Sequence, residues 1–218
     1  MTLLKAIFEE VTFTSSQISS LFRKKRPIIE DPSVILYHGY LSGVFYMNDI
    51  MNYLDSEGFP SFAENYHFLE DMRITTKKET EKIDRICQKK GEKVSLIGHS
   101  QGGLIATSIA QDNPELINKV IALGTPFYGT KAAYLQYPVI SCKQMLSGSS
   151  YLQELREKGF PEEVDFHSIM TFYDHIVIPY DSARAPFIGK NIETELVDDC
   201  GHASLIKHHE LIVDILKK

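Results

Sequence analysis

The 218-residue sequence predicts an α/β fold in which a mostly parallel sheet of about six strands is covered by helices on both faces. Two observations predict it. Short apolar runs alternate with longer helical stretches, as in a parallel sheet with helices packed on both sides. The composition, with 43% hydrophobic and 24% charged residues, is that of one globular domain.

The predicted strands and helices follow one another with short connections. Strands are expected over residues 34–37, 59–65, 94–97, 120–123, 168–173 and 193–197. Helices are expected over residues 46–56, 74–90, 102–112 and 204–216, with a longer irregular part over 125–163. We therefore divide the chain into an N-terminal arm, 1–33, and a domain, 34–218, with a lid-like insertion at about 127–163. In such sheets chemistry gathers beyond the carboxyl ends of the strands.

Charge and cysteine content exclude several classes of protein. The net charge is −6 and the isoelectric point lies near 5.8, so nucleic acid is not an expected partner. Three cysteines are too few for a disulfide framework and fit a reducing compartment. No run of 18 apolar residues and no signal-peptide pattern is present, and we expect a cytoplasmic protein.

The N-terminal arm combines an amphipathic stretch with a basic cluster at residues 23–26. One interpretation is a helix packed on the domain and then a solvated linker ended by Pro27; this is the favoured one. The other is peripheral contact with an anionic membrane surface. The apolar positions at helical spacing are Leu3, Leu4, Ile7, Phe8 and Val11.

A Gly-x-Ser-x-Gly motif centred on Ser100 carries the strongest functional signal. It joins the predicted strand 94–97 to the predicted helix 102–112, which is the context of a nucleophile elbow. Such a tight turn strains the central residue, and side chains at Gly98 or Gly102 would collide. The turn presents the Ser100 hydroxyl above the sheet edge, at the start of a helix.

A serine hydroxyl needs a base, and a late histidine is expected from the order serine, acid, histidine. His202 follows the strand 193–197 in a loop, where it can meet Ser100. His208 and His209 lie within the predicted last helix, where packed or exposed histidines are usual. We therefore expect His202 to be the base.

The acid that orients the base should also lie at a carboxyl end. Asp174 ends the strand 168–173 and meets this condition, with Asp181 as its main rival in the same loop. Asp165 precedes the strand, at the opposite edge. Asp198 and Asp199 are close to His202 in sequence but are expected to face solvent.

Two backbone amides are expected to form an oxyanion hole. One is the N–H of Gln101, which directly follows the nucleophile. The other is the N–H of Tyr40, in the loop after the first strand, where Gly39 permits close approach of the backbone. The side chains of His38, His99 and Gln101 are expected to shape these loops rather than to take part in chemistry.

From about Val34 to Leu216 the sequence resembles the bacterial triacylglycerol lipases and esterases of the α/β-hydrolase superfamily. The resemblance implies the α/β-hydrolase fold and carboxylic ester hydrolysis, with Ser100, Asp174 and His202 as the triad; Phe127 departs from the family's usual histidine. The motifs that carry it lie at 37–40 (His-Gly oxyanion loop), 98–103 (elbow), 123–130 (Leu-Gly-Thr-Pro stretch), 144–155 (segment before the acid strand), 173–179 (acid loop) and 201–206 (histidine loop).

The aromatic-rich insertion predicts either the wall of an acyl pocket or ordinary helix packing on the sheet. In the first interpretation the substrate is a small acyl ester or lipid with an apolar chain, since each buried methylene contributes about 0.8 kcal/mol. The expected substrate contacts are Phe127, Tyr128, Leu135, Tyr137, Ile176 and Val177.

No cofactor and no metal is expected. Among Cys200, His202, His208 and His209, only the last two are close on one element, and neighbouring helical positions do not share a face. Three related activities would use the same triad: acyl-thioesterase, phospholipase and acyltransferase. A catalytically silent binding protein on the same fold is the more distant alternative.

Overall fold

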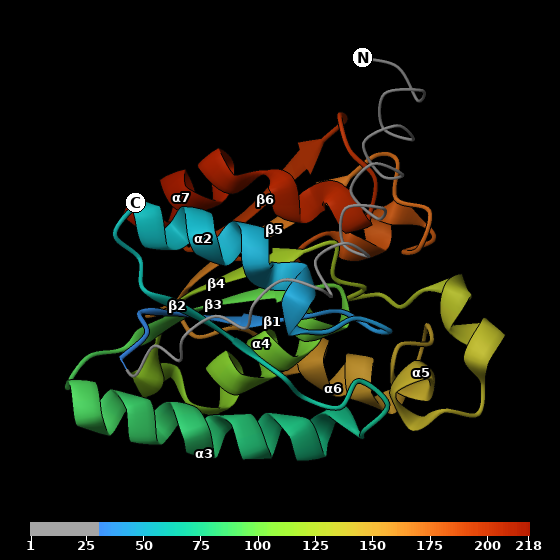
Figure 1. Ribbon diagram of the computed structural model, residues 1–218. Helices are drawn as coiled ribbons and strands as arrows, with labels where there is room; N and C mark the ends of the chain where they lie inside the picture. The colour runs from blue at the N-terminus through green and yellow to red at the C-terminus, as the bar shows by residue number, and fades with distance from the viewer. Residues whose placement is uncertain (1–30) are drawn as a thin grey trace.

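The computed structural model describes residues 31–218. The N-terminal arm expected over 1–33, with its amphipathic face and basic cluster, lies almost entirely outside the described residues, so both interpretations of it stay predictions. The remainder folds around one central sheet (Figure 1).

The sheet contains six parallel strands in the order β2-β1-β3-β4-β5-β6, which confirms the predicted fold class. β1 and β2 are the shortest strands, with four residues each, and every residue of β1, inside the sheet, is buried. The strands are β1 (Val34–Tyr37), β2 (Ser61–Glu64), β3 (Val94–His99), β4 (Ile117–Leu123), β5 (Asp165–Thr171) and β6 (Ile192–Val197).

Helices cover both faces of this sheet. On one face lie α3 (Met72–Lys90), α4 (Gln101–Asp112) and α6 (Ser150–Glu157), and on the other lie α2 (Asn48–Ser56) and α7 (His209–Lys217) (Figure 1). Because successive strand residues point to opposite faces, a strand between two helical layers is apolar at consecutive positions. Ile35 accordingly packs in the core of the α3 and α4 face, and its neighbour Leu36 in that of α2 and α7.

The boundaries of α3 follow from its terminal residues. The Asp71 carboxylate caps its start by accepting the backbone N–H of Arg73 at 2.8 Å. Gly91 ends it with a φ of 72°, a left-handed conformation that glycine adopts without strain.

The irregular part after β4 consists of short helices with loops between them. They are η3 (Lys131–Gln136) and α5 (Ile140–Gln144), followed by α6. Elsewhere the connections contain η1 (Val44–Met47), η2 (Pro114–Leu116), η4 (Tyr180–Ala183) and η5 (Ala203–Lys207).

The expectation of one closing helix over 204–216 is wrong. The segment is divided into η5 and α7, because His208 between them has φ −72° and ψ 52°, outside the helical region. Its side chain is turned toward Asp199, with 3.0 Å between Nε2 and Oδ1.

The chain order places a crevice at the carboxyl ends of β1 and β3. These strands are neighbours, with Tyr37 beside Gly98, but the chain leaves β1 toward β2 and leaves β3 toward β4. The loops after the two strands therefore diverge, and ligands of such sheets bind where they separate.

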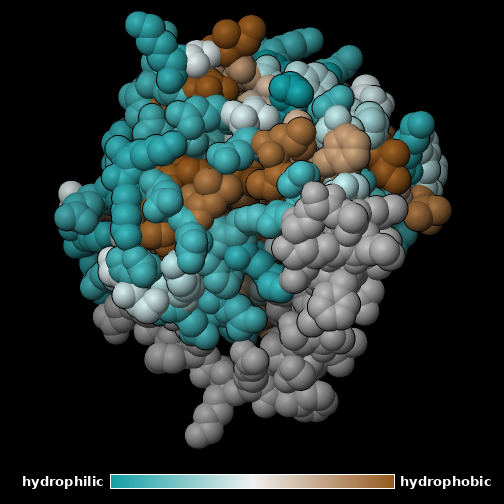
Figure 2. Space-filling model, turned by 90° about the horizontal axis from the view of Figure 1, so that it is seen from above, coloured by the Kyte–Doolittle hydropathy of each residue, from teal (hydrophilic) through white to brown (hydrophobic). Residues whose placement is uncertain are grey.

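The side of the molecule that carries α2 and α7 is mostly hydrophilic. Seen from above, apolar side chains gather in a band across the middle of this face (Figure 2). Among the helices of residues 31–218, none is both long and apolar enough to cross a bilayer.

Candidate active site

The loop between β3 and α4 holds Ser100 in a strained conformation. Ser100 has φ 54° and ψ −120°, a region that a non-glycine residue adopts only when the surrounding structure imposes it. The Ser100 N–H donates to the carbonyl of Leu123 at 2.8 Å, which fixes the turn to the end of β4. Its hydroxyl is thereby placed at the amino end of α4.

The two glycines of the motif are required by the closeness of other backbone atoms. A Cβ on Gly102 would lie 2.2 Å from the carbonyl oxygen of Tyr37, at the end of β1. A Cβ on Gly98 would lie 2.4 Å from the Gly102 oxygen, on the far side of the turn. Since backbone cannot move away as a side chain can, the elbow closes only with glycine at both positions.

His202 and Asp174 form a buried pair although they come from different loops. His202 Nδ1 and Asp174 Oδ2 are 2.8 Å apart, and the Asp174 side chain is only 1% exposed. An Nδ1–H donated to the carboxylate leaves Nε2 with a free lone pair, the tautomer that a general base needs. His202 lines the same cleft as Ser100.

The second oxygen of Asp174 is also satisfied. Its Oδ1 accepts the backbone N–H groups of Ile176 at 2.9 Å and Val177 at 2.7 Å. Burial alone would raise the pKa of this carboxyl, but the neighbouring His202 and these hydrogen bonds outweigh burial and lower the pKa below its usual 3.8. Asp174 is thus held as a carboxylate.

The rival acids are placed elsewhere. Asp181 is more than half exposed and lies 3.7 Å from Arg184, and Asp198 is exposed. Asp165 is the first residue of β5, at the opposite edge of the sheet, and Asp199 pairs with His208. The other late histidine, His209, begins α7 and packs against the ring of Tyr53.

The loop after β1 brings Gly39 and Tyr40 to the wall of the cleft beside Ser100. His38 shapes this loop: its Nδ1–H donates to the carbonyl of Gly39 at 2.9 Å, and its ring stacks on Tyr66 at 4.3 Å. Burial lowers the pKa of His38, so the ring is neutral. The Tyr40 hydroxyl donates to the side-chain oxygen of Gln136, which ties the loop to η3.

Gln101 is the first residue of α4, so its backbone N–H is one of the first-turn amides that have no acceptor within the helix. Its side chain is directed elsewhere, since Nε2 donates to the carbonyl of Phe68 at 2.9 Å. Gln101 therefore offers a backbone donor next to Ser100 while its amide side chain holds a neighbouring loop.

Two threonines hold the histidine and acid loops, and neither was given a role from the sequence, although Thr130 ends the 123–130 motif. The Thr171 hydroxyl donates to the carbonyl of Cys200 at 2.6 Å and joins the end of β5 to the His202 loop. Thr130 Oγ1 accepts the N–H of Ile178 at 3.1 Å and donates to the carbonyl of Ile176. A threonine at a strand end or in a loop has no sequence signal that distinguishes such a role.

The cleft above Ser100 and His202 has a volume of about 500 Å³. Its lining is mostly apolar, and part of it comes from η3 and α5, which form one wall. Leu135 of η3 is strongly exposed at this wall, and so is Leu41 in the loop after β1. The aliphatic, proline and phenylalanine residues of the lining are Leu41, Phe45, Pro126, Ala132, Ala133, Leu135, Met145, Ile176, Val177 and Ala203.

The expected substrate contacts divide into two groups. Leu135, Ile176 and Val177 lie on the lining of the cleft. Phe127 is corrected: it is fully buried in the core, with its ring 5.7 Å from that of Phe166, because the chain turns inward after β4.

The two tyrosines predicted to contact substrate are also not brought to the lining. Tyr128 lies under the guanidinium of Arg156, and Tyr137 under the ammonium of Lys143, both on the outer surface. Each exposed ring makes a cation–π contact with its neighbour, so both rings have an interaction partner outside the cleft.

Comparison with known proteins agrees with this architecture. The model of the family described as alpha/beta hydrolase fold matches residues 75–139, which include the elbow. The mature lipase BlEst2 of Bacillus licheniformis has a TM-score of 0.68 and 18% identity, covering 89% of this chain and 94% of its own. Lipase B of Aspergillus fumigatus has a TM-score of 0.74 and 17% identity, covering 90% of this chain and 56% of its own.

A curated protein is also similar in sequence. Phospholipase A(1) LCAT3 of Arabidopsis thaliana is 26% identical over 155 residues, which is 65% of this chain and 33% of that protein. The chain thus matches about a third of that relative's length. Together these comparisons confirm the α/β-hydrolase fold and support the resemblance to its lipases and esterases, while a bacterial subgroup stays a prediction.

Proposed function

We propose that this protein is a serine carboxylic ester hydrolase that acts through an acyl-enzyme on esters with an apolar acyl chain. One observation carries the proposal: the strained Ser100 and His202, which is paired with the buried Asp174 carboxylate, border one apolar cleft. The lipases and esterases among the similar structures are consistent with it.

In the proposed reaction His202 Nε2 takes the proton of the Ser100 hydroxyl as its oxygen attacks the ester carbonyl. The negative oxygen that develops is stabilised by the backbone N–H groups of Gln101 and Tyr40. His202 then gives its proton to the departing alcohol, which leaves an ester on Ser100. Water, deprotonated by His202, hydrolyses that ester and restores the hydroxyl.

The apolar lining supports the choice of acyl chain. Each methylene transferred from water to the wall contributes about 0.8 kcal/mol, or roughly fourfold in kcat/KM. We also propose that the segment from η3 to α5, within the 127–163 insertion, serves as the lid, since Leu135 there is 86% exposed beside the cleft.

Turnover of p-nitrophenyl esters tests the proposal. Ser100→Ala should lower kcat by several orders of magnitude, whereas the control Ser56→Ala, at an exposed position on α2, should keep the wild-type rate. A fluorophosphonate probe should label the wild type and leave Ser100→Ala unlabelled. Equal turnover by wild type and Ser100→Ala would refute the proposal.

A phospholipid acyl ester is the second candidate substrate, because the curated relative described above is named as a phospholipase A(1). Parallel assays with monoacyl esters, acyl-thioesters and phospholipid vesicles separate the candidates. Hydrolysis of phospholipid at a higher kcat/KM than soluble esters would favour the second, and transfer of the acyl group to an added alcohol would identify an acyltransferase.

A further inference from the structure

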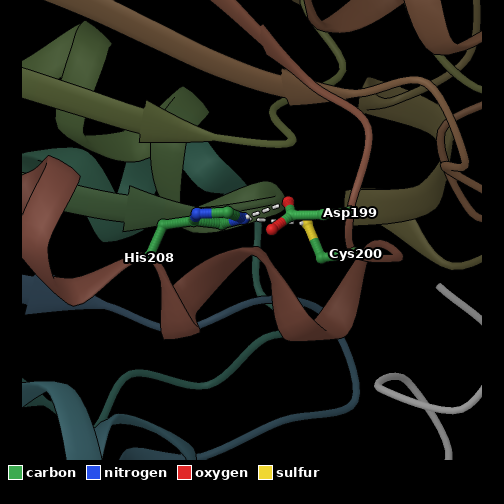
Figure 3. Close-up of side chains that lie close together, drawn as sticks. All are labelled: Asp199, Cys200 and His208. Atoms are coloured by element: carbon green, nitrogen blue, oxygen red, sulfur yellow. Dashed lines mark hydrogen bonds and ion pairs between the residues drawn. The ribbon is translucent and has the colours of Figure 1, made fainter. Parts of the chain in front are cut away.

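A second cluster of reactive side chains includes two residues of the loop that carries His202. Within residues 31–218, the donor atoms of Asp199, Cys200 and His208 all fall within 4.8 Å of one another. Asp199 and Cys200 follow β6, and His208 lies at the start of α7, eight residues beyond Cys200. Figure 3 shows the imidazole directed at both the carboxylate and the sulfur.

Hydrogen bonds within the cluster do not account for all of its close approaches. His208 Nε2 lies 3.0 Å from Asp199 Oδ1 and 3.3 Å from Cys200 Sγ. One ring nitrogen carries at most one hydrogen, so it cannot serve both acceptors along good directions. Asp199 Oδ1 is buried, and no donor of the described residues is aligned to give it a hydrogen bond.

We propose that Asp199, Cys200 and His208 bind a zinc ion through one oxygen, one sulfur and one nitrogen. In a tetrahedral zinc site with bonds of about 2.0 to 2.3 Å, neighbouring donors lie about 3.3 to 3.6 Å apart. The two separations from His208 are slightly shorter, and all three donors lie within 4.8 Å of one another, so the side chains would adjust by rotation on binding. A thiolate and a carboxylate would together balance the charge of the ion.

The donor set selects the class of metal. Calcium and magnesium prefer oxygen ligands, whereas a thiolate with an imidazole suits zinc and its first-row neighbours. Cys200 is only 4% exposed, but the side chains of His208 and Asp199 are 20% and 40% exposed, so the ion has a path from solvent. A water molecule would complete the fourth position.

The proposal changes the interpretation reached from the sequence, which considered Cys200 with His202, His208 and His209 and rejected a metal. In the structure Asp199 takes part, while His202 pairs with Asp174 and His209 packs on Tyr53. Bound zinc would connect the loop after β6 to the start of α7 and so link the two ends of the segment that carries His202.

Zinc and cobalt titration of the purified full chain, stripped of metal, tests this site. We expect one equivalent of zinc to bind by calorimetry and to raise the unfolding temperature. Cobalt should bind at the same stoichiometry and give a thiolate-to-metal charge-transfer band, which reports Cys200 in the unaltered protein.

Variants locate the ion. His208→Ala and Cys200→Ala should each weaken zinc binding at least about tenfold, and Cys200→Ala should remove the cobalt band. His67→Ala, at an exposed histidine, and Cys87→Ala, at a buried cysteine of α3, should retain both. Circular dichroism establishes that each variant is folded, and Asp199→Asn at a partly exposed position provides a further ligand variant.

No saturable binding by wild type, or unchanged affinity in both His208→Ala and Cys200→Ala, would overturn the site. Because the readouts are binding and spectra, this outcome is independent of ester hydrolysis: the zinc proposal can fail while Ser100 remains active, and the reverse.

Discussion

His99 makes the stability of the protein depend on acidity in a calculable way. Its Nε2–H donates to the carbonyl of His202 at 3.0 Å, and its ring packs 4.8 Å from the His202 ring. Burial, with the neighbouring His202, lowers the pKa of His99 from 6.5 to about 3, so the ring is neutral in the folded protein. In the unfolded chain the same ring takes a proton below about pH 6.5.

The sign follows from counting protons. Between about pH 6.5 and 3 the unfolded state binds more protons than the folded state, so stability rises with pH and is lost as pH falls. From pH 7 to pH 4.5 the imbalance amounts to about 2–3 kcal/mol for a pKa of about 3. At pH 4.5 the Asp174 carboxyl, with its pKa below 3.8, contributes little to the change.

His99→Gln isolates this term. Glutamine places an amide nitrogen near the position of Nε2, so it can donate to the His202 carbonyl, but it does not titrate. Urea unfolding at pH 7 and 4.5 should show that the loss of stability on acidification is about 2–3 kcal/mol smaller in the variant than in wild type.

Other titrating groups cancel from this comparison. Burial lowers the pKa of His167, and burial with Glu64 raises the pKa of Glu79 to about 7, but both act alike in the two proteins. His67→Gln, at an exposed position, is the matched control and should behave as wild type. If His99→Gln loses as much stability on acidification as wild type, His99 is not the buried neutral group described here.

Three further outcomes follow from the site. Asp174→Asn should lower kcat about 10⁴-fold with little change in KM in an ester assay, and an unchanged kcat would remove Asp174 from the triad. Leu135→Ala should reduce the kcat/KM preference for octanoyl over acetyl esters roughly threefold, while Ile188→Ala, fully exposed outside the cleft, should not. Gly102→Ala should lower the free energy of unfolding in urea by at least about 3 kcal/mol, because its Cβ would lie 2.2 Å from a backbone oxygen. The control Gly148→Ala should lower it by about 1 kcal/mol, because Gly148 has a φ of 78° but no atom close to the added Cβ. Equal losses of stability in the two variants would contradict the steric argument.

The sequence predicted the fold well because local signals and burial agreed. Each strand that the structure contains overlaps a predicted strand. The inner strands β1, β3 and β4 are buried on both faces and are therefore apolar at most consecutive positions, whereas β6, at the edge of the sheet, is mostly exposed. The elbow was predictable because any such turn brings backbone atoms too close to these two positions for a side chain, which requires glycine at both. Chain order at the carboxyl ends then led to Asp174 as the predicted acid and His202 as the predicted base.

The remaining features depend on contacts between segments far apart in the chain. As an aromatic residue in the insertion, Phe127 could equally belong to a pocket or to the core. Only its packing on Phe166, 39 positions later, identifies it as a core residue. The break at His208 is likewise invisible locally, since the sequence around it has helical periodicity and the cause is a turn of the side chain toward Asp199.

The loop of His202 shows why the proposed base could be predicted from the sequence when the residues that hold its loop could not. Three residues of its loop accept hydrogen bonds at their carbonyl oxygens: Cys200 from Thr171, His202 from His99, and Ala203 from the hydroxyl of Tyr46. The donors come from the ends of β5 and β3 and from η1, so sheet register rather than loop sequence sets where the imidazole stands. Because backbone carbonyls accept these bonds, the side chains of the loop do not reveal them. The His202 loop is thus held by residues as far away as Tyr46, which is 157 positions before Ala203.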